Sequence, residues 1–106
     1  MGFMDLFRSV NIDQGVREYA ATPGAVLLDV RTREEYREGH IPGSRNVPVQ
    51  EMHGMGRLAE DPAAPVFVYC YSGARSRQAA GQLKRMGYTN VKDLGGIAAY
   101  TGRVER

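Results

Sequence analysis

Short apolar runs alternate along this chain with segments that carry helical signals. Three runs rich in apolar and β-branched residues, 25–30, 66–69 and 90–94, have the pattern of strands buried in a sheet. Apolar residues spaced for one helical face occupy 13–21 and 74–87, and a T-x-x-E capping box opens a third helix at Thr32. This alternation predicts a small α/β domain with a mostly parallel sheet flanked by helices.

Weaker signals complete the expected domain. Residues 10–12 and 45–47 are each expected to add a brief strand, which raises the predicted sheet to about five strands. Asp13 is expected to cap the first helix, and two glycines make any helix over 50–58 irregular. Gly95 and Gly96 predict a tight turn into a final short helical stretch. The domain is expected to span 10–106.

Residues 1–9 form a separate amphipathic extension that includes Phe3, Met4, Leu6 and Phe7. The favoured interpretation is a helical turn that covers the flank of the domain itself. Contact with a partner or a membrane surface is the alternative.

Composition limits the function. The 106 residues carry a net charge of +2 with no run of like charge, which argues against nucleic acid as the main partner. Two distant histidines and one cysteine have no metal-ligand spacing, so neither a metal nor a cofactor is expected. There is no apolar stretch long enough to span a bilayer and no secretory signal pattern. We therefore expect a cytoplasmic protein without stable membrane association.

The only cysteine, Cys70, ends the most apolar of the predicted strands. Ser72 and Gly73 follow it in a turn, and a helix is expected from Ala74. The free N–H groups and positive dipole of a helix N-terminus can hold an anion, and a thiol placed there ionises more readily. A single cysteine forms no internal disulfide, which fits a reducing compartment. Cys70 is therefore a candidate nucleophile rather than a packed core residue.

Three segments together resemble the motifs of rhodanese domains. Cys70-Tyr71-Ser72-Gly73-Ala74-Arg75-Ser76 resembles their C-x-x-G-x-R-S loop, and Asp29-Val30-Arg31 resembles their D-x-R strand end. Residues 39–48 resemble their G-H-I-P-G-S and N-x-P segment. The resemblance runs from about Val10 to the C-terminus and implies a free-standing single-domain rhodanese. At Ile97 and Tyr100 the chain departs from relatives that carry tryptophans there.

The resemblance implies a sulfurtransferase with a cysteine persulfide intermediate. Cys70 would take sulfane sulfur from thiosulfate or a persulfide donor and pass it to cyanide, a thiol or an acceptor protein. The loop from Tyr71 to Ser76 (Tyr71, Ser72, Gly73, Ala74, Arg75, Ser76) would bind the anionic group. An open, shallow pocket is expected because no second domain is present.

Charged residues around the loop have two interpretations each. Arg75 can bind the anion directly, or it can turn back to Asp29 or Glu35 and brace the loop, which we favour. Asp29 and Arg31 are expected to form a supporting hydrogen-bonded pair with the loop, although Arg31 could also attract thiosulfate. His40 lies in a segment whose proline and glycine favour a structural turn over a general base.

Two other classes of function compete with this interpretation. A cysteine-dependent phosphatase uses C-x5-R, whereas four residues separate Cys70 from Arg75, and that shorter loop suits a sulfur atom better than a phosphoryl group. An arsenate reductase that finishes with an internal disulfide needs a second cysteine. The second class is a non-enzymatic binding module, but inactive rhodanese-like domains usually lack the cysteine.

Overall fold

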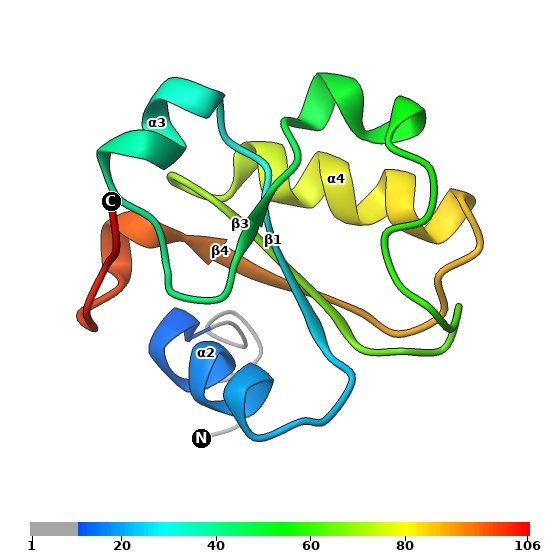
Figure 1. Cartoon of the computed structure of the whole chain (residues 1–106), viewed down its shortest axis with the longest axis horizontal. Helices are drawn as coiled ribbons and strands as arrows, with labels where there is room; N and C mark the ends of the chain where they lie inside the picture. The colour runs from blue at the N-terminus through cyan, green and yellow to red at the C-terminus, as the bar shows by residue number, and fades with distance from the viewer. Residues whose placement is uncertain (1–10) are drawn as a thin grey trace, which may run out of the picture.

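A parallel sheet of four strands lies at the centre of the protein, in a computed structural model that describes residues 11–106. Its spatial order is β2-β1-β3-β4. The strands are β1 (Val26–Asp29), β2 (Arg45–Asn46), β3 (Val66–Cys70) and β4 (Val91–Gly96). The helices are α2 (Ile12–Ala20), α3 (Arg33–Glu38) and α4 (Ala74–Arg85), with the short 3-10 segments η1 (Val49–Gly54) and η2 (Ile97–Ala99). Figure 1 shows α2 and α4 on opposite sides of the sheet.

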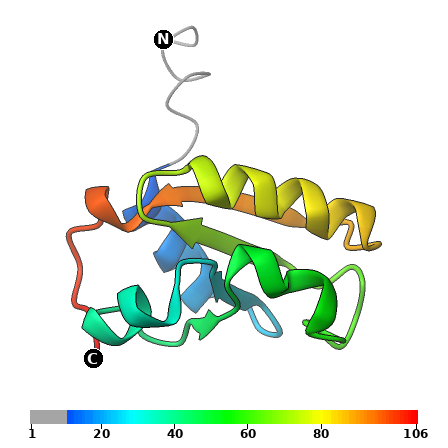
Figure 2. The ribbon, with the colours of Figure 1, turned by 90° about the horizontal axis from the view of Figure 1, so that it is seen from above.

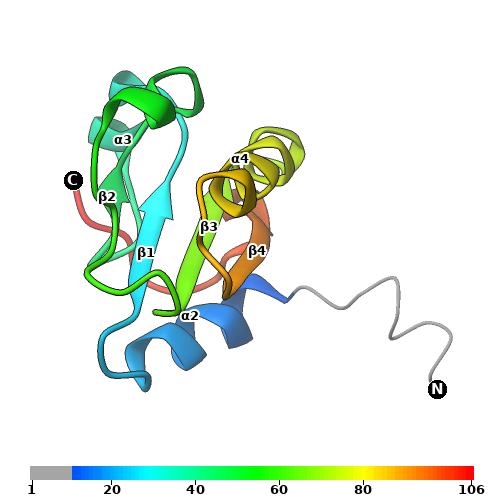
Figure 3. The ribbon, with the colours of Figure 1, turned by 90° about the vertical axis from the view of Figure 1, so that its right-hand side faces the viewer.

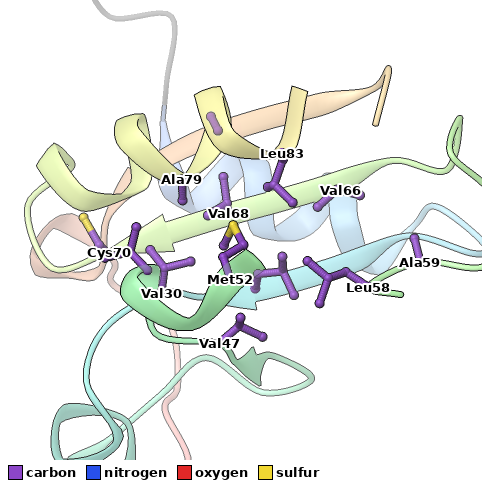
Figure 4. Packing of buried hydrophobic residues seen from close by; sticks show 13 residues of the cluster. Val30, Val47, Met52, Leu58, Ala59, Val66, Val68, Cys70, Ala79 and Leu83 are labelled. Atoms are coloured by element: carbon purple, nitrogen blue, oxygen red, sulfur yellow. The ribbon is translucent and has the colours of Figure 1, made fainter. Parts of the chain in front are cut away.

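Both faces of the sheet are buried under helices. Successive side chains of a strand point to opposite faces, so each strand contributes to both clusters. On one face, side chains of β1 and β3 pack against α4 and η1, and this cluster includes Leu28, Val68, Cys70, Met52 and Leu83 (Figure 4). The other face packs against α2 through a second cluster, which contains Leu27, Phe67, Tyr69, Ile12 and Leu94. This double burial explains why β3 is a continuous apolar run.

The start of the described chain corrects one prediction. Ile12 begins α2, so the edge strand expected over 10–12 is wrong for residues 11 and 12, and the sheet has four strands instead of five. The cap of α2 is Asn11, whose side chain accepts the Gln14 N–H at 3.3 Å. Asp13, which was expected to cap this helix, accepts hydrogen bonds from Thr101 instead. The amphipathic extension proposed for residues 1–9 lies outside the described residues.

Other boundaries follow the sequence more closely. The capping box at Thr32 is confirmed, with the Thr32 and Glu35 side chains each accepting the backbone N–H of the other residue. The last strand is longer than expected, because β4 continues through Gly95 and Gly96 after an irregularity in its register with β3. The two glycines therefore lie beside the end of β3 rather than in a turn beyond the sheet.

The carboxyl ends of the central strands meet at one edge of the sheet. β1 and β3 pair in parallel with Asp29 opposite Tyr69, so Asp29 and Cys70 emerge at the same edge. α3 and the first turn of α4 lie at that end of the molecule (Figure 2). α2 packs on the face of the sheet opposite to α4 (Figure 3). Sites in open α/β sheets form at this edge, and the residues singled out from the sequence gather there.

Candidate active site

Cys70 is the last residue of β3, and its thiol lies against the backbone turn that leads into α4. The side chain is buried, and its Sγ accepts the N–H of Gly73 at 3.0 Å and the N–H of Ser76 at 3.3 Å. The turn is possible because Gly73, the cap of α4, has a φ of +113°, a backbone conformation that side chains disfavour. The cysteine sulfur therefore occupies the anion position at a helix N-terminus.

These contacts favour the thiolate. Burial raises the pKa of the Cys70 thiol, but the nearby Ser76 hydroxyl and the backbone N–H groups of Ser76, Gly73 and Arg75 outweigh that effect. The pKa of Cys70 consequently lies below its ordinary value. A thiol that loses its proton easily is the form of cysteine that acts as a nucleophile.

Ser76 is the buried polar residue closest to this arrangement. Its hydroxyl contacts the carbonyl oxygens of Gly73 at 3.1 Å and Gly95 at 3.4 Å. Because a hydroxyl has one proton, donation to the Cys70 thiolate requires it to turn away from these carbonyls. Ser76 thus has a second possible acceptor once negative charge develops on the sulfur.

The first residues of the loop run very close to β4. A Cβ at Gly96 would overlap the Tyr71 carbonyl oxygen and lie 2.6 Å from the Cα of Ser72, so only glycine fits there. The Ala98 N–H donates to the same carbonyl of Tyr71 at 3.1 Å. The side chain of Tyr71 points outward and is 53% exposed. Ser72 and Ala74 are also exposed, so the outer side of the loop is open to solvent.

Asp29 and Arg31 form a buried ion pair beside the loop. The Arg31 Nη2 donates to Asp29 Oδ2 at 2.7 Å and to the carbonyl oxygen of Gly39 at the same distance. Asn46 Nδ2 donates to the backbone carbonyls of both residues, at 3.0 and 2.9 Å. These hydrogen bonds tie the end of β1 to residues 39–46 rather than to the Cys70 loop.

Arg75 points away from the sulfur and toward α3. Its Nη1 and Nη2 donate to Glu35 Oε1 at 2.8 Å and Oε2 at 3.1 Å. Glu35 is one of the two partners that the sequence offered for a bracing role of Arg75. The structure thus places Arg75 in contact with Glu35 and not with Asp29, which pairs with Arg31.

His40 occupies a structural position in the turn after α3. Its ring stacks on Tyr36 with centroids 3.7 Å apart, and its Nδ1 lies 2.8 Å from the Tyr36 carbonyl oxygen. The backbone of His40 pairs with Glu105 near the C-terminus. Since Nδ1 faces a carbonyl, this nitrogen carries the proton and donates it. These contacts account for the residue without a catalytic role.

One hollow of the described structure lies away from Cys70. It has a volume of about 690 Å³, and its lining includes Val26 and Arg45 at the amino ends of β1 and β2 and Leu58 in the segment before β3. No group of three or more potential metal-ligating side chains occurs in the described part of the chain. Within the same residues, none of the helices has the length and apolar character needed to cross a membrane.

Comparisons with known proteins agree with this geometry. Residues 13–103 match the family model described as "Rhodanese-like domain". The chain is 38% identical over 71 residues to the thiosulfate sulfurtransferase PspE of Escherichia coli, covering 66% of this chain and 68% of that protein. It is 42% identical over 84 residues to a sulfurtransferase of Allochromatium vinosum, covering 76% of each. Other relatives are longer. The chain covers 64% of the length of the protein YqhL of Bacillus subtilis and 23% of the length of the adenylyltransferase and sulfurtransferase uba4 of Ogataea parapolymorpha.

Solved structures resemble the fold as well. A structure described as a rhodanese with anions, from Escherichia coli, matches with a TM-score of 0.66 at 30% identity. The match covers 77% of this chain and 98% of that one. The similarity therefore extends over most of this chain and nearly all of that structure.

Proposed function

The chain belongs to the family of rhodanese-like domains, and we propose that it is a sulfurtransferase that carries sulfane sulfur on Cys70. The observation that carries the proposal is the pair of backbone N–H groups, from Gly73 and Ser76, aimed at the Cys70 sulfur. Relatives named as thiosulfate sulfurtransferases support the same activity. The domain is proposed to span 10–106, with residues 1–9 as an extension.

The reaction would proceed in two halves. The Cys70 thiolate attacks the outer sulfur of thiosulfate or of a persulfide, and the S–S bond of the donor breaks. Sulfite, or the thiolate of the donor, leaves with the electron pair, and the sulfur remains on Cys70 as a persulfide. Cyanide, a small thiol or a thiol of an acceptor protein then attacks the terminal sulfur and restores the Cys70 thiolate.

The loop would stabilise negative charge in both halves. The N–H groups of the first turn of α4 are fixed by the helix and need no reorganisation when charge appears on sulfur. The exposed outer side of the loop, including Tyr71, Ser72 and Ala74, leaves room for a donor or acceptor to approach. The relative solved with anions supports an anion-binding role. We place the reaction in the cytoplasm, because a single cysteine that forms no internal disulfide fits reducing surroundings.

The phosphatase alternative is weaker on geometric grounds. A phosphatase needs its loop arginine to hold the phosphoryl oxygens. In this protein the guanidinium of Arg75 already makes two hydrogen bonds to the Glu35 carboxylate. A phosphoryl group would have to displace that carboxylate before it could be bound.

Intact-mass measurement tests the proposal. The purified protein is incubated with thiosulfate, and the expected result is a gain of about one sulfur atom, which cyanide or a thiol then removes. Cys70→Ser should show no gain and keep the circular dichroism of the native domain. Sulfur transfer by Cys70→Ser would contradict the assignment. Hydrolysis of a small aryl phosphate without a mass gain would favour the phosphatase, and neither activity would favour a binding module.

A further inference from the structure

We propose that Glu35 is a positioning residue for the reactive loop, holding Arg75 so that the first turn of α4 keeps its N–H groups on Cys70. The inference rests on the proposed role of Cys70 as the nucleophile. Glu35 touches neither the sulfur nor a substrate position, so its effect passes through Arg75. Nothing in the motif that contains Cys70 identifies this residue.

The contact between Glu35 and Arg75 is bidentate. Two guanidinium nitrogens donate to two carboxylate oxygens, at 2.8 and 3.1 Å, and each side chain is about one-third exposed. Bidentate pairs of this kind fix orientation as well as distance. Because the two residues are 40 positions apart, the contact joins α3 to the first turn of α4.

Arg75 lies between this anchor and the sulfur. Arg75 belongs to the first turn of α4, and the next residue, Ser76, donates its backbone N–H to the sulfur at 3.3 Å. A constraint on the side chain of Arg75 therefore restricts the backbone next to that donor. The same turn starts from Gly73, which donates the other N–H to the sulfur at 3.0 Å.

Glu35 is itself held firmly. Its Oε1 accepts the backbone N–H of Thr32 at 2.9 Å and the Thr32 hydroxyl at 3.1 Å. Thr32 follows closely after β1, a central strand of the sheet. The carboxylate thus connects the reactive turn to the sheet through the capping box of α3. One side chain serves both as helix cap and as anchor.

Because Glu35 is negatively charged, the direction in which its removal shifts the ionisation of Cys70 tests the proposal. If the carboxylate acted only as a nearby negative charge, its removal would favour the Cys70 thiolate. Removal would favour it further if the freed Arg75 swung toward the sulfur. If the carboxylate positions the donors, its removal should disfavour the thiolate. The two mechanisms therefore predict opposite shifts in the reactivity of Cys70.

The test is the pH profile of Cys70 alkylation by iodoacetamide in Glu35→Gln. Glutamine can still cap α3 through its carbonyl oxygen but cannot form the bidentate pair. We expect alkylation at pH 7 to slow about fivefold, the size of one weakened hydrogen bond to a charged sulfur, and the profile to move to higher pH. Lys at position 75 cannot form the fork, so Arg75→Lys should show the same effect.

Three controls separate positioning from other causes. Ser44→Ala removes a buried hydroxyl that contacts Tyr69 and lies outside the Glu35–Arg75 contact, and it should leave the alkylation profile unchanged. Glu51→Gln removes the same charge from an exposed pair with Arg33 and should also leave it unchanged. In an Arg75→Ala background, Glu35→Gln should change the rate less than twofold.

An unchanged profile in Glu35→Gln, or a move to lower pH, would overturn the proposal. A slower reaction caused by general loosening is recognised because Glu51→Gln, which releases a different contact of α3, would then slow it as well. Alkylation needs no sulfur donor, so the result stands apart from the proposed reaction. A shifted profile without persulfide formation would leave the positioning role intact and remove the sulfurtransferase assignment.

Discussion

At the scale of single residues, reactivity is concentrated on one atom, the Cys70 sulfur. Burial alone would suppress ionisation of this thiol, because a thiolate in apolar surroundings loses its hydration. The Ser76 hydroxyl and the backbone N–H groups of Ser76, Gly73 and Arg75 reverse that tendency and lower the pKa of Cys70. The turn of the chain therefore supplies several of the groups that favour the thiolate, and Ser76 adds a side chain.

Ser76→Ala tests the one side-chain contribution. The hydroxyl stabilises the thiolate only after it leaves the Gly73 carbonyl, so its removal should raise the pKa of Cys70 and slow alkylation at pH 7 by about fivefold. Stopped-flow alkylation across a pH series measures this effect. Ser44→Ala is the matched control, since Ser44 is a buried serine that contacts Tyr69 instead. An unchanged profile in Ser76→Ala would assign the hydroxyl to loop structure alone.

The sequence could identify Cys70 and its neighbours, but it left two carboxylates, Asp29 and Glu35, as possible partners of Arg75. Cys70, Gly73 and Ser76 are adjacent in the chain, so a strand-turn-helix pattern already brings them together. Glu35 is recognisable in the sequence as a helix cap, but only the packed structure shows that it, and not Asp29, contacts Arg75. Patterns with a short period report local geometry, and contacts between distant segments depend on the packed fold.

At the scale of elements, the sequence patterns that predicted the correct helix or strand were those that fit only one kind of element. A continuous apolar run before Cys70 predicts a buried strand, and β3 occupies it. The short segment near Ile12 fits a strand or a helix start equally well. In the structure it is the start of α2, which packs against β4. Gly95 and Gly96 predicted a turn, but they lie in β4, and the absence of a side chain at Gly96 allows the loop backbone to pass close to the strand.

Gly96→Ala tests that contact. A methyl group at this position meets the backbone of Tyr71 and Ser72, which cannot move aside as a flexible side chain could. We expect a loss of about 2 kcal/mol in the free energy of unfolding, the usual range for overpacking, together with reduced sulfur loading of Cys70. Urea denaturation and intact mass measure the two effects.

Gly54→Ala is the control for this substitution. Gly54 ends η1, and a Cβ there meets nothing within 4 Å, so the variant should unfold like the wild type. If both variants lost the same stability, the effect would reflect glycine replacement in general. Full activity of Gly96→Ala would contradict the close approach of β4 to the loop.

At the scale of the whole molecule, distant segments are fastened together around the reactive edge. Glu35 joins α3 to α4, Asp13 of α2 accepts two hydrogen bonds from Thr101, and the backbone of His40 pairs with Glu105. Two of these three fastenings depend on a carboxylate that must stay ionised. The arrangement should therefore weaken in acid.

The Glu35 contact allows this acid sensitivity to be measured. The hydrogen bonds from Arg75 lower the pKa of Glu35 from 4.5 to about 2 in the folded protein. A carboxylate whose pKa is depressed by folding stabilises the fold above its unfolded pKa, and that stabilisation disappears as the pH falls toward the folded value. After allowance for solvent screening of a one-third exposed pair, the contribution near neutral pH should be about 1 to 2 kcal/mol.

Unfolding of the wild type and of Glu35→Gln by urea, compared from pH 7 to pH 2.5, measures this contribution. The difference in free energy of unfolding between the two proteins should be largest near pH 7. It should shrink between about pH 4.5 and pH 2.5, because protonation then removes from the wild type what the substitution has already removed. Glu51→Gln, which alters an exposed pair, should differ little from the wild type throughout. A difference that stayed constant with pH would mean that the carboxylate stabilises the fold through its shape rather than its charge. The loop would then be anchored by packing.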